Sequence, residues 1–210
     1  MRVGHALGYR HDVPPPPFSH FRSAFPDAYG LDVDTVEMLL GRPDLVPAGT
    51  SVVHVAGENL SIPYRIYHHV PDAAAADTLT ETQQLIMGCL LTRHHDGFVR
   101  QAYLEKIATA KQPWIAPYVV HLVGEYVIEI VTAVGYKLTQ TDNAGTPQQM
   151  RYGRFVAENP AFLNLIRQRA SSYWNCYYRG LYARLADYPG ITIVESLTRA
   201  GQIYSSATPH

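Results

Sequence analysis

Three ionisable residues recur at intervals of four inside the most apolar segment of the chain. His121, Glu125 and Glu129 all fall between Pro113 and Val134, where nearly every other residue is apolar. In an α-helix this spacing places the three side chains on one face. An imidazole beside two carboxylates could act as a general base or hold a metal ion. The pattern therefore identifies a candidate catalytic site at His121, Glu125 and Glu129.

Ion pairing offers a second interpretation of the same acids, and it is the one we favour. A buried, unpaired carboxylate is very costly, so Glu125 and Glu129 need cationic partners if their helix is central. Arg93, Arg100 and the arginines of residues 151–184 could supply them. We expect both carboxylates to be buried and at least one to be paired with an arginine. Solvent exposure of the acids is the remaining alternative.

A second group with metal-binding chemistry is His94-His95-Asp96. Together with the distant His121, its H-x-D pattern fits a site made of two histidines and one carboxylate. An aspartate directly before a helical apolar pattern is also typical of a helix N-cap, and such a pattern begins at Phe98. We favour the cap for Asp96 and an exposed loop for the histidines. A metal site at His94, His95 and Asp96 is the alternative.

A third group combines arginines with large aromatic rings in one helical segment. Its members are Arg169, Tyr173, Trp174, Tyr177, Tyr178, Arg179, Tyr182 and Arg184. Such a segment could be an aromatic core helix, a protein interface or a stacking surface for single-stranded nucleic acid. Its rings cover more of the helix circumference than one core contact uses, so some should face a second surface. The expected binding residues are Arg169, Tyr173, Trp174, Tyr177 and Tyr178.

The composition favours a soluble protein with a buried partner surface. Of 210 residues, 47% are hydrophobic and 17% are charged, against about 25% charged in average proteins. The 15 tyrosines agree with this, because tyrosine is enriched at interfaces. The net charge of −1 argues against nucleic acid as a partner. The carboxylates of segment 113–134 argue against a membrane-spanning helix.

The cysteines and the common catalytic motifs give mainly negative information. Cys89 and Cys176 belong to no C-x-x-C motif, so we expect both to be core residues in a reducing cytoplasm. The signatures of nucleotide-binding loops, zinc metalloproteases and serine hydrolases are absent. We therefore expect no cofactor.

The N-terminal part of the chain predicts an arm and a hairpin. Residues 1–30 read as an extended arm, because four prolines, Pro14 to Pro17, favour polyproline II. The arm also contains the aromatic residues Phe18, Phe21 and Phe25, whose rings should dock on the domain or on a partner. After a short helix ending near Leu40, the alternation over residues 53–66 predicts a β-hairpin.

The remainder reads as helices. Thr80 and Gln83 form a capping-box signature for a helix ending near Leu91. Further helices are expected over residues 98–110, 113–134 and 161–178. A short strand over residues 191–197 and a flexible tail from 205 to 210 complete the chain.

Two of these helices resemble one HEAT-type α-hairpin. The resemblance depends on Asp96-Gly97-Phe98-Val99-Arg100 at the start of the first helix and on Pro113 at the start of the apolar second one. It covers residues 96–134, and no second copy follows at a fixed period. HEAT proteins are mostly protein-binding scaffolds, and the resemblance implies that role here.

The sequence thus predicts a mainly α fold, a helical bundle or α/α hairpin stack with a small β-hairpin. We expect a single domain over residues 31–204 that is a non-enzymatic binding or adaptor protein, self-associating or binding another protein through its Tyr/Arg-rich helix. A small metal-dependent or acid-base enzyme is the alternative. Its site would combine His94, His95, Asp96, His121, Glu125 and Glu129.

Overall fold

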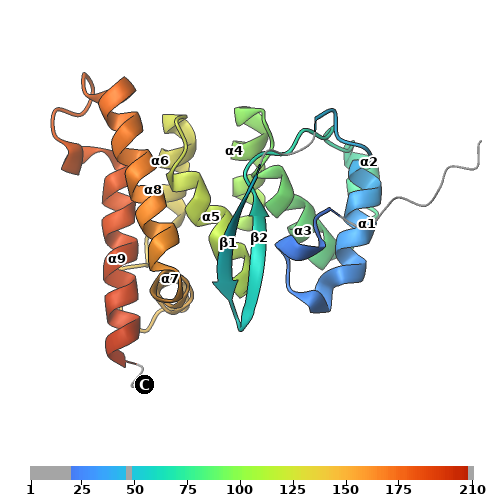
Figure 1. The fold of residues 1–210 in the computed structure, drawn as a ribbon, viewed down its shortest axis with the longest axis horizontal. Helices are drawn as coiled ribbons and strands as arrows, with labels where there is room; N and C mark the ends of the chain where they lie inside the picture. Colours follow the sequence, from blue (N-terminus) through green and yellow to red (C-terminus); the bar gives the residue numbers. More distant parts are fainter. Residues whose placement is uncertain (1–19, 46–48, 208–210) are drawn as a thin grey trace, which may run out of the picture.

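The computed structural model describes residues 20–45 and 49–207, and this part of the chain is mainly helical with one β-hairpin (Figure 1). The helices and strands are α1 (Gly30–Leu40), β1 (Thr50–Val55), β2 (Glu58–Pro63), α2 (Ala73–Ala76), α3 (Glu81–Leu91), α4 (Gly97–Ile107), α5 (Ala116–Val123), α6 (Ile128–Lys137), α7 (Pro147–Glu158), α8 (Pro160–Tyr173) and α9 (Pro189–Ala207). This confirms the predicted fold class. In the described ranges, no helix combines the length and apolar character needed to cross a membrane.

The helices are spread along the long axis of the molecule, and the β1–β2 hairpin lies near its middle (Figure 1). Helices α1, α2 and α3 lie at one end, and α7, α8 and α9 lie at the other. Helix α5 lies between them, and all of its residues are buried. The core therefore runs through the position that the sequence predicts for its most apolar helix.

The end of the predicted arm packs on the domain. Phe21 and Phe25 are buried, on either side of the short 3-10 turn η1 (Arg22–Ala24). The Phe25 ring lies 5.4 Å from those of Trp114 and Tyr118. Burial of these rings stabilises the contact between this segment and the start of α5. Pro14 to Pro17 and Phe18 lie outside the described residues.

The predicted β-hairpin is present, and it closes through a two-residue turn between Val55 and Glu58. Ala56 and Gly57 both have positive φ angles, 53° and 95°, as a tight hairpin turn requires. Asn159, the residue before α8, fastens the hairpin to the helices. Its side chain accepts from the His54 amide and donates to the His54 carbonyl, both at 2.7 Å.

The prediction of one continuous helix over residues 113–134 is wrong. Helix α5 ends at Val123, and α6 begins at Ile128. Gly124 lies in the break, where a Cβ atom would be only 3.3 Å from Ile166 of α8. The close approach of α8 at a glycine and the turn that follows it separate the two helices. Of the HEAT-like hairpin, the first helix and its capping residue are present, and the second helix is divided.

The predicted strand at residues 191–197 is also wrong, because this segment belongs to the 19-residue helix α9. The apolar residues Ile191, Ile193 and Leu197 suggested a strand. Pro189 at the first helical position and buried residues spaced three and four apart are the helical signals that outweighed them. The helix continues through Ala207, so the segment predicted as a tail from residue 205 is helical as far as it is described.

Helices α7 and α9 cross at two glycines. A Cβ atom at Gly153 would lie 2.5 Å from the carbonyl oxygen of Ala200, and one at Gly201 would lie 2.9 Å from Val156. The buried side chain of Gln149 donates a 3.0 Å hydrogen bond to the same Ala200 carbonyl. The pair is therefore packed backbone against backbone, with no space for larger residues.

The two cysteines have different environments. Cys89 in α3 is buried, and burial raises the pKa of its thiol well above the usual value. Cys176 is exposed, in the π-helix η4 (Trp174–Tyr178) that extends α8. The prediction that both are core residues holds for Cys89 and is wrong for Cys176.

Candidate functional site

Glu125 lies at the centre of a buried group of arginines. Arg65 forms a bidentate ion pair with it, with Nη1–Oε1 and Nη2–Oε2 distances of 2.9 and 2.5 Å. Arg93 lies 3.4 Å and Arg100 lies 3.6 Å from the carboxylate. The predicted burial and arginine pairing of Glu125 are confirmed. The predicted burial of Glu129 is wrong, because its side chain is exposed in the first turn of α6.

Each arginine is held in place by backbone carbonyls as well as by Glu125. Arg93, directly after α3, donates to the carbonyls of Pro63 and Tyr64 at the end of β2, at 3.3 and 2.8 Å. Arg100, in α4, donates to the carbonyls of His94 and His95, both at 2.8 Å. One carboxylate thus connects the hairpin, α3, α4 and the α5–α6 break.

A fourth arginine, Arg169 of α8, lies beside these three. We call Arg65, Arg93, Arg100 and Arg169 the arginine cluster. The guanidinium carbon of Arg169 lies 4.7 Å from the centre of the Tyr64 ring, and that of Arg65 lies 5.1 Å from the same ring. Tyr64 is therefore contacted by two cations, an arrangement that the ring quadrupole favours. Among the described residues, no acidic side chain forms an ion pair with Arg169.

The local charges determine the protonation of Glu125 and Arg93. Burial alone would raise the pKa of Glu125, but the charge of Arg93 and the hydrogen bonds of Arg65 lower it below its usual value. Burial lowers the pKa of Arg93 to about 9, and the repulsion of Arg65, Arg100 and Arg169 adds to this effect while Glu125 opposes it. Glu125 is therefore ionised, and both of its oxygens accept hydrogen bonds from Arg65. Because its pKa is lowered, it would be a weak general base.

His121 is buried among aromatic rings and is not connected to the carboxylates. Its ring lies 6.1 Å from the Tyr64 ring and 5.6 Å from that of Phe162. Neither of its nitrogens has a hydrogen-bond partner among the described residues. Burial, together with the charges of Arg93 and Arg169, lowers its pKa well below the usual value. The break after α5 thus divides the predicted catalytic stripe into a neutral histidine, an ion-paired acid and an exposed acid.

The His94-His95-Asp96 group forms a loop structure. Asp96 accepts a 2.8 Å hydrogen bond from the Phe98 amide and caps α4, which confirms the predicted N-cap. The His94 ring bonds the His68 carbonyl and the Asp96 amide, at 2.9 and 3.0 Å. His95 is exposed, as predicted, and stacks on Tyr67. The predicted exposure is wrong for His94, whose side chain is buried. Within residues 20–45 and 49–207, no group of three or more His, Cys, Asp or Glu side chains is placed to hold a metal ion.

Replacing Asp96 with alanine should lower the free energy of unfolding by about 1 kcal/mol, because the first amides of α4 lose their acceptor. Asp96→Asn keeps an oxygen at that position and should be nearly neutral. Urea unfolding of the two variants beside the wild type measures both values. Equal losses for alanine and asparagine would show that the carboxylate charge, and not capping, is what α4 requires.

The arginine-aromatic segment lies next to the arginine cluster. Tyr126, in the α5–α6 break, packs its ring 6.2 Å from that of Tyr173. The Tyr178 hydroxyl donates a 2.5 Å hydrogen bond to the Tyr126 carbonyl. The structure therefore brings together two groups that the sequence treats separately: the acid-bearing segment at Glu125 and the aromatic end of α8.

A continuous series of tyrosine rings extends from this junction, with neighbouring ring centres 5.5–6.4 Å apart. In contact order these are Tyr126, Tyr173, Tyr177, Tyr178, Tyr188 and Tyr182, which we call the tyrosine series. Its inner member Tyr188 is fully buried, whereas Tyr177 is 68% and Tyr126 51% exposed. Trp174 is half-buried and donates to the Tyr182 carbonyl at 2.8 Å. Of the predicted binding residues, Tyr177 is therefore exposed, whereas Tyr173, Trp174 and Tyr178 are half-buried against neighbouring groups.

Comparisons with known proteins identify no relative. The chain matches no protein-family model, no curated protein and no solved structure. The function must therefore be inferred from the site itself.

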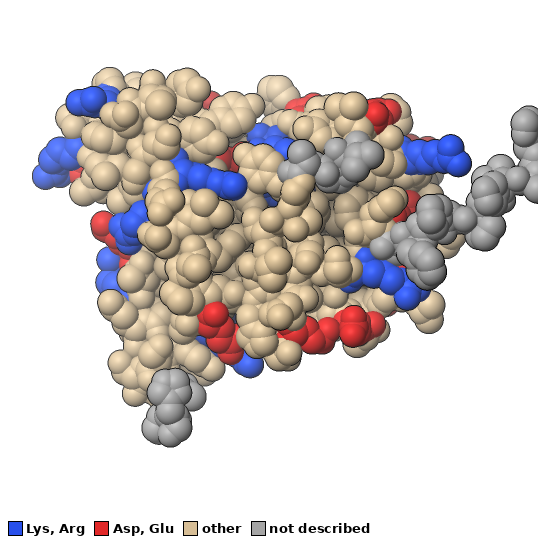
Figure 2. Space-filling view, viewed as in Figure 1, with Lys and Arg blue, Asp and Glu red and all other residues tan. Residues whose placement is uncertain are grey.

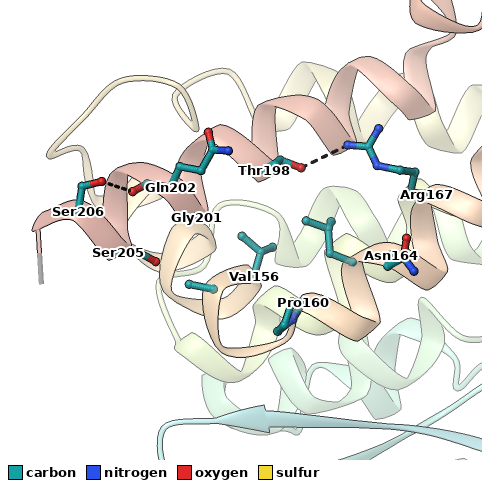
Figure 3. Close-up of a pocket in the computed structure, with 11 residues that line it drawn as sticks. Val156, Pro160, Asn164, Arg167, Thr198, Gly201, Gln202, Ser205 and Ser206 are labelled. Atoms are coloured by element: carbon teal, nitrogen blue, oxygen red, sulfur yellow. Dashed lines mark hydrogen bonds between the residues drawn. The ribbon is translucent and has the colours of Figure 1, made fainter. Parts of the chain in front are cut away.

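A groove at the end of α7, α8 and α9 has no counterpart in the sequence analysis (Figure 3). Its volume is about 540 Å³. Val156, Pro160 and Leu163 form an apolar side, and Arg167 closes one end through a 3.4 Å hydrogen bond to Thr198. Helix α9 adds the polar residues Gln202, Ser205 and Ser206. No acid, cysteine or histidine is among the described residues that line this groove.

Proposed function

We propose that this chain is a non-enzymatic protein-binding protein, and that it binds its partner through the exposed part of the tyrosine series beside Arg169. The observation that carries the proposal is the exposure of Tyr126 and Tyr177 on either side of Tyr173, which follows the half-buried Arg169 by one turn of α8. Tyrosine and arginine are among the residue types that contribute most to binding energy in protein interfaces.

The supporting rings of this surface are well ordered by their contacts. Tyr173 and Tyr178 are held by neighbouring rings, and Tyr178 is also fixed by its hydrogen bond to Tyr126. A surface that is rigid before binding loses little conformational entropy when a partner docks. Figure 2 shows that much of the face over the hairpin is uncharged and that basic side chains gather toward α8 and α9. A partner with acidic residues at its rim would complement that distribution.

The enzymatic alternative has less support. Glu125 is held as a carboxylate by guanidinium groups, and His121 is buried and forms no hydrogen bond to Glu125. Acid-base catalysis needs a group that exchanges protons within reach of a substrate. We therefore interpret these residues as parts of the scaffold that positions the binding surface.

The proposal is tested by Tyr177→Ser, with Tyr136→Ser as the matched control. Tyr136 is 77% exposed on α6 and belongs to no ring pair among the described residues. Sedimentation velocity at micromolar concentration measures self-association. A photo-crosslinking amino acid at position 177 or 136, introduced in the native source, measures binding to other proteins.

We expect Tyr177→Ser to weaken the interaction roughly tenfold or more, as for an interface hot spot, and Tyr136→Ser to leave it unchanged. Crosslinking at position 177 to a copy of the chain identifies a homo-oligomer, and to one different protein an adaptor role. Two results together would refute the proposed surface: a monomeric wild type, and no more crosslinks from the probe at position 177 than from the probe at position 136.

A further inference from the structure

The arginine cluster contains more positive charge than the described residues neutralise. Glu125 is the acid paired with Arg65, Arg93 and Arg100, and Arg169 brings a further cation beside Tyr64. Backbone carbonyls accept several guanidinium hydrogen bonds here, but they bring no net charge. Burying charges without a counter-charge is very unfavourable. The excess positive charge of the arginine cluster would therefore be unfavourable without a further counter-charge.

The arginine cluster also contains buried hydrogen-bond donors that have no partner among the described residues. The Arg100 side chain is fully buried, and its Nε and Nη2 atoms have no hydrogen-bond partner among the described residues. Nη2 lies 3.6 Å from Glu125, beyond hydrogen-bond distance. Buried guanidinium donors are nearly always satisfied in folded proteins. Arg100 is thus an independent sign that an acceptor group belongs here.

The cluster reaches the surface through Arg65, Tyr64 and Arg169. The Arg65 side chain is 14% exposed, and Tyr64 and Arg169 are half-buried. Tyr173 borders the same area, because it follows Arg169 by one turn of α8 and its ring lies 6.2 Å from that of Tyr126. A ligand group could approach the cluster from solvent beside Arg169, between α8 and the end of β2.

We infer that the arginine cluster is a binding site for a single anionic group, a carboxylate or a phosphate. Guanidinium groups match both geometrically, because their planar donors bind two oxygens at once. The anion would lower the repulsion among the four arginines and supply the acceptors that Arg100 lacks. This inference does not depend on the protein-binding function proposed above.

The test uses inorganic phosphate and malonate as probes, with sodium chloride at equal ionic strength as the reference. Thermal unfolding is followed for the wild type, Arg169→Gln and Arg167→Gln. Arg167 lies on the same helix, two residues earlier, and bonds Thr198 outside the cluster. Tyr177→Ser is a second control, because losing the exposed ring should not change anion binding. The two proposals can therefore fail separately.

We expect phosphate, malonate or both to raise the unfolding midpoint saturably above the chloride reference. Arg169→Gln should weaken that response about tenfold, the effect of one charged hydrogen bond, while Arg167→Gln keeps it. Without added anion, Arg169→Gln should unfold at no lower temperature than the wild type, because a repelling charge is removed. A response to one anion alone identifies the group. No saturable response, or an equal response from Arg169→Gln, would overturn the inference.

Discussion

Replacing Glu125 with alanine is expected to lower the free energy of unfolding by about 3–5 kcal/mol, the cost of breaking a buried ion pair from one side. The variant would leave Arg65, Arg93 and Arg100 without their carboxylate, two of them with fully buried side chains. Their mutual repulsion would then be unopposed. Urea unfolding followed by circular dichroism measures the loss.

Glu129→Ala is the matched control for this variant. It removes the same side chain four residues later, where the carboxylate is exposed. Its effect should stay within about 0.5 kcal/mol. Comparable losses for the two variants would mean that the arginines tolerate a missing counter-charge, and that the cluster is not held together by Glu125.

Replacing Gly153 with valine is expected to destabilise the protein by about 3 kcal/mol, the upper part of the usual range for overpacking. Even the Cβ atom would lie 2.5 Å from the Ala200 carbonyl oxygen, which belongs to the backbone of α9. The helices would have to separate, and the hydrogen bond from Gln149 to Ala200 would be lost with them. Thermal and urea unfolding both report the change.

Gly180→Ala provides the comparison. A Cβ atom at that position meets nothing within 4 Å, so the substitution should be neutral or slightly stabilising. If Gly153→Val unfolded at the wild-type urea concentration, the α7–α9 crossing would not be as close as described.

Local chemistry allowed several elements to be predicted from the sequence. Thr80 and Gln83 form the expected capping box, and Asp96 caps α4. These signals involve neighbouring residues whose side chains satisfy nearby amides, so they do not depend on the rest of the fold. The break at Gly124 does depend on it. An apolar run with one glycine is compatible with a continuous helix, and the approach of α8 could not be inferred from it.

The candidate site shows the same distinction. The burial and ion pairing of Glu125 followed from the acids in an apolar segment, since a buried carboxylate needs a cation. The same argument was wrong for Glu129, which is exposed. Arg65 was not identified as its bidentate partner, because it is 60 residues away and follows a strand of ordinary appearance. The contact between Tyr126 and Tyr173 likewise depends on how α8 packs against the α5–α6 break. Tertiary packing, and not residue type, decides which of the candidate groups meet.

The contrast between the two cysteines has a practical consequence for labelling. A maleimide reacts with accessible thiolates, and Cys89 is both enclosed and held in its protonated form. Cys176 is exposed and immediately precedes Tyr177. The folded wild-type chain should therefore take up a fluorophore at one position, beside the tyrosine series. A probe attached there would report directly on whatever covers that surface.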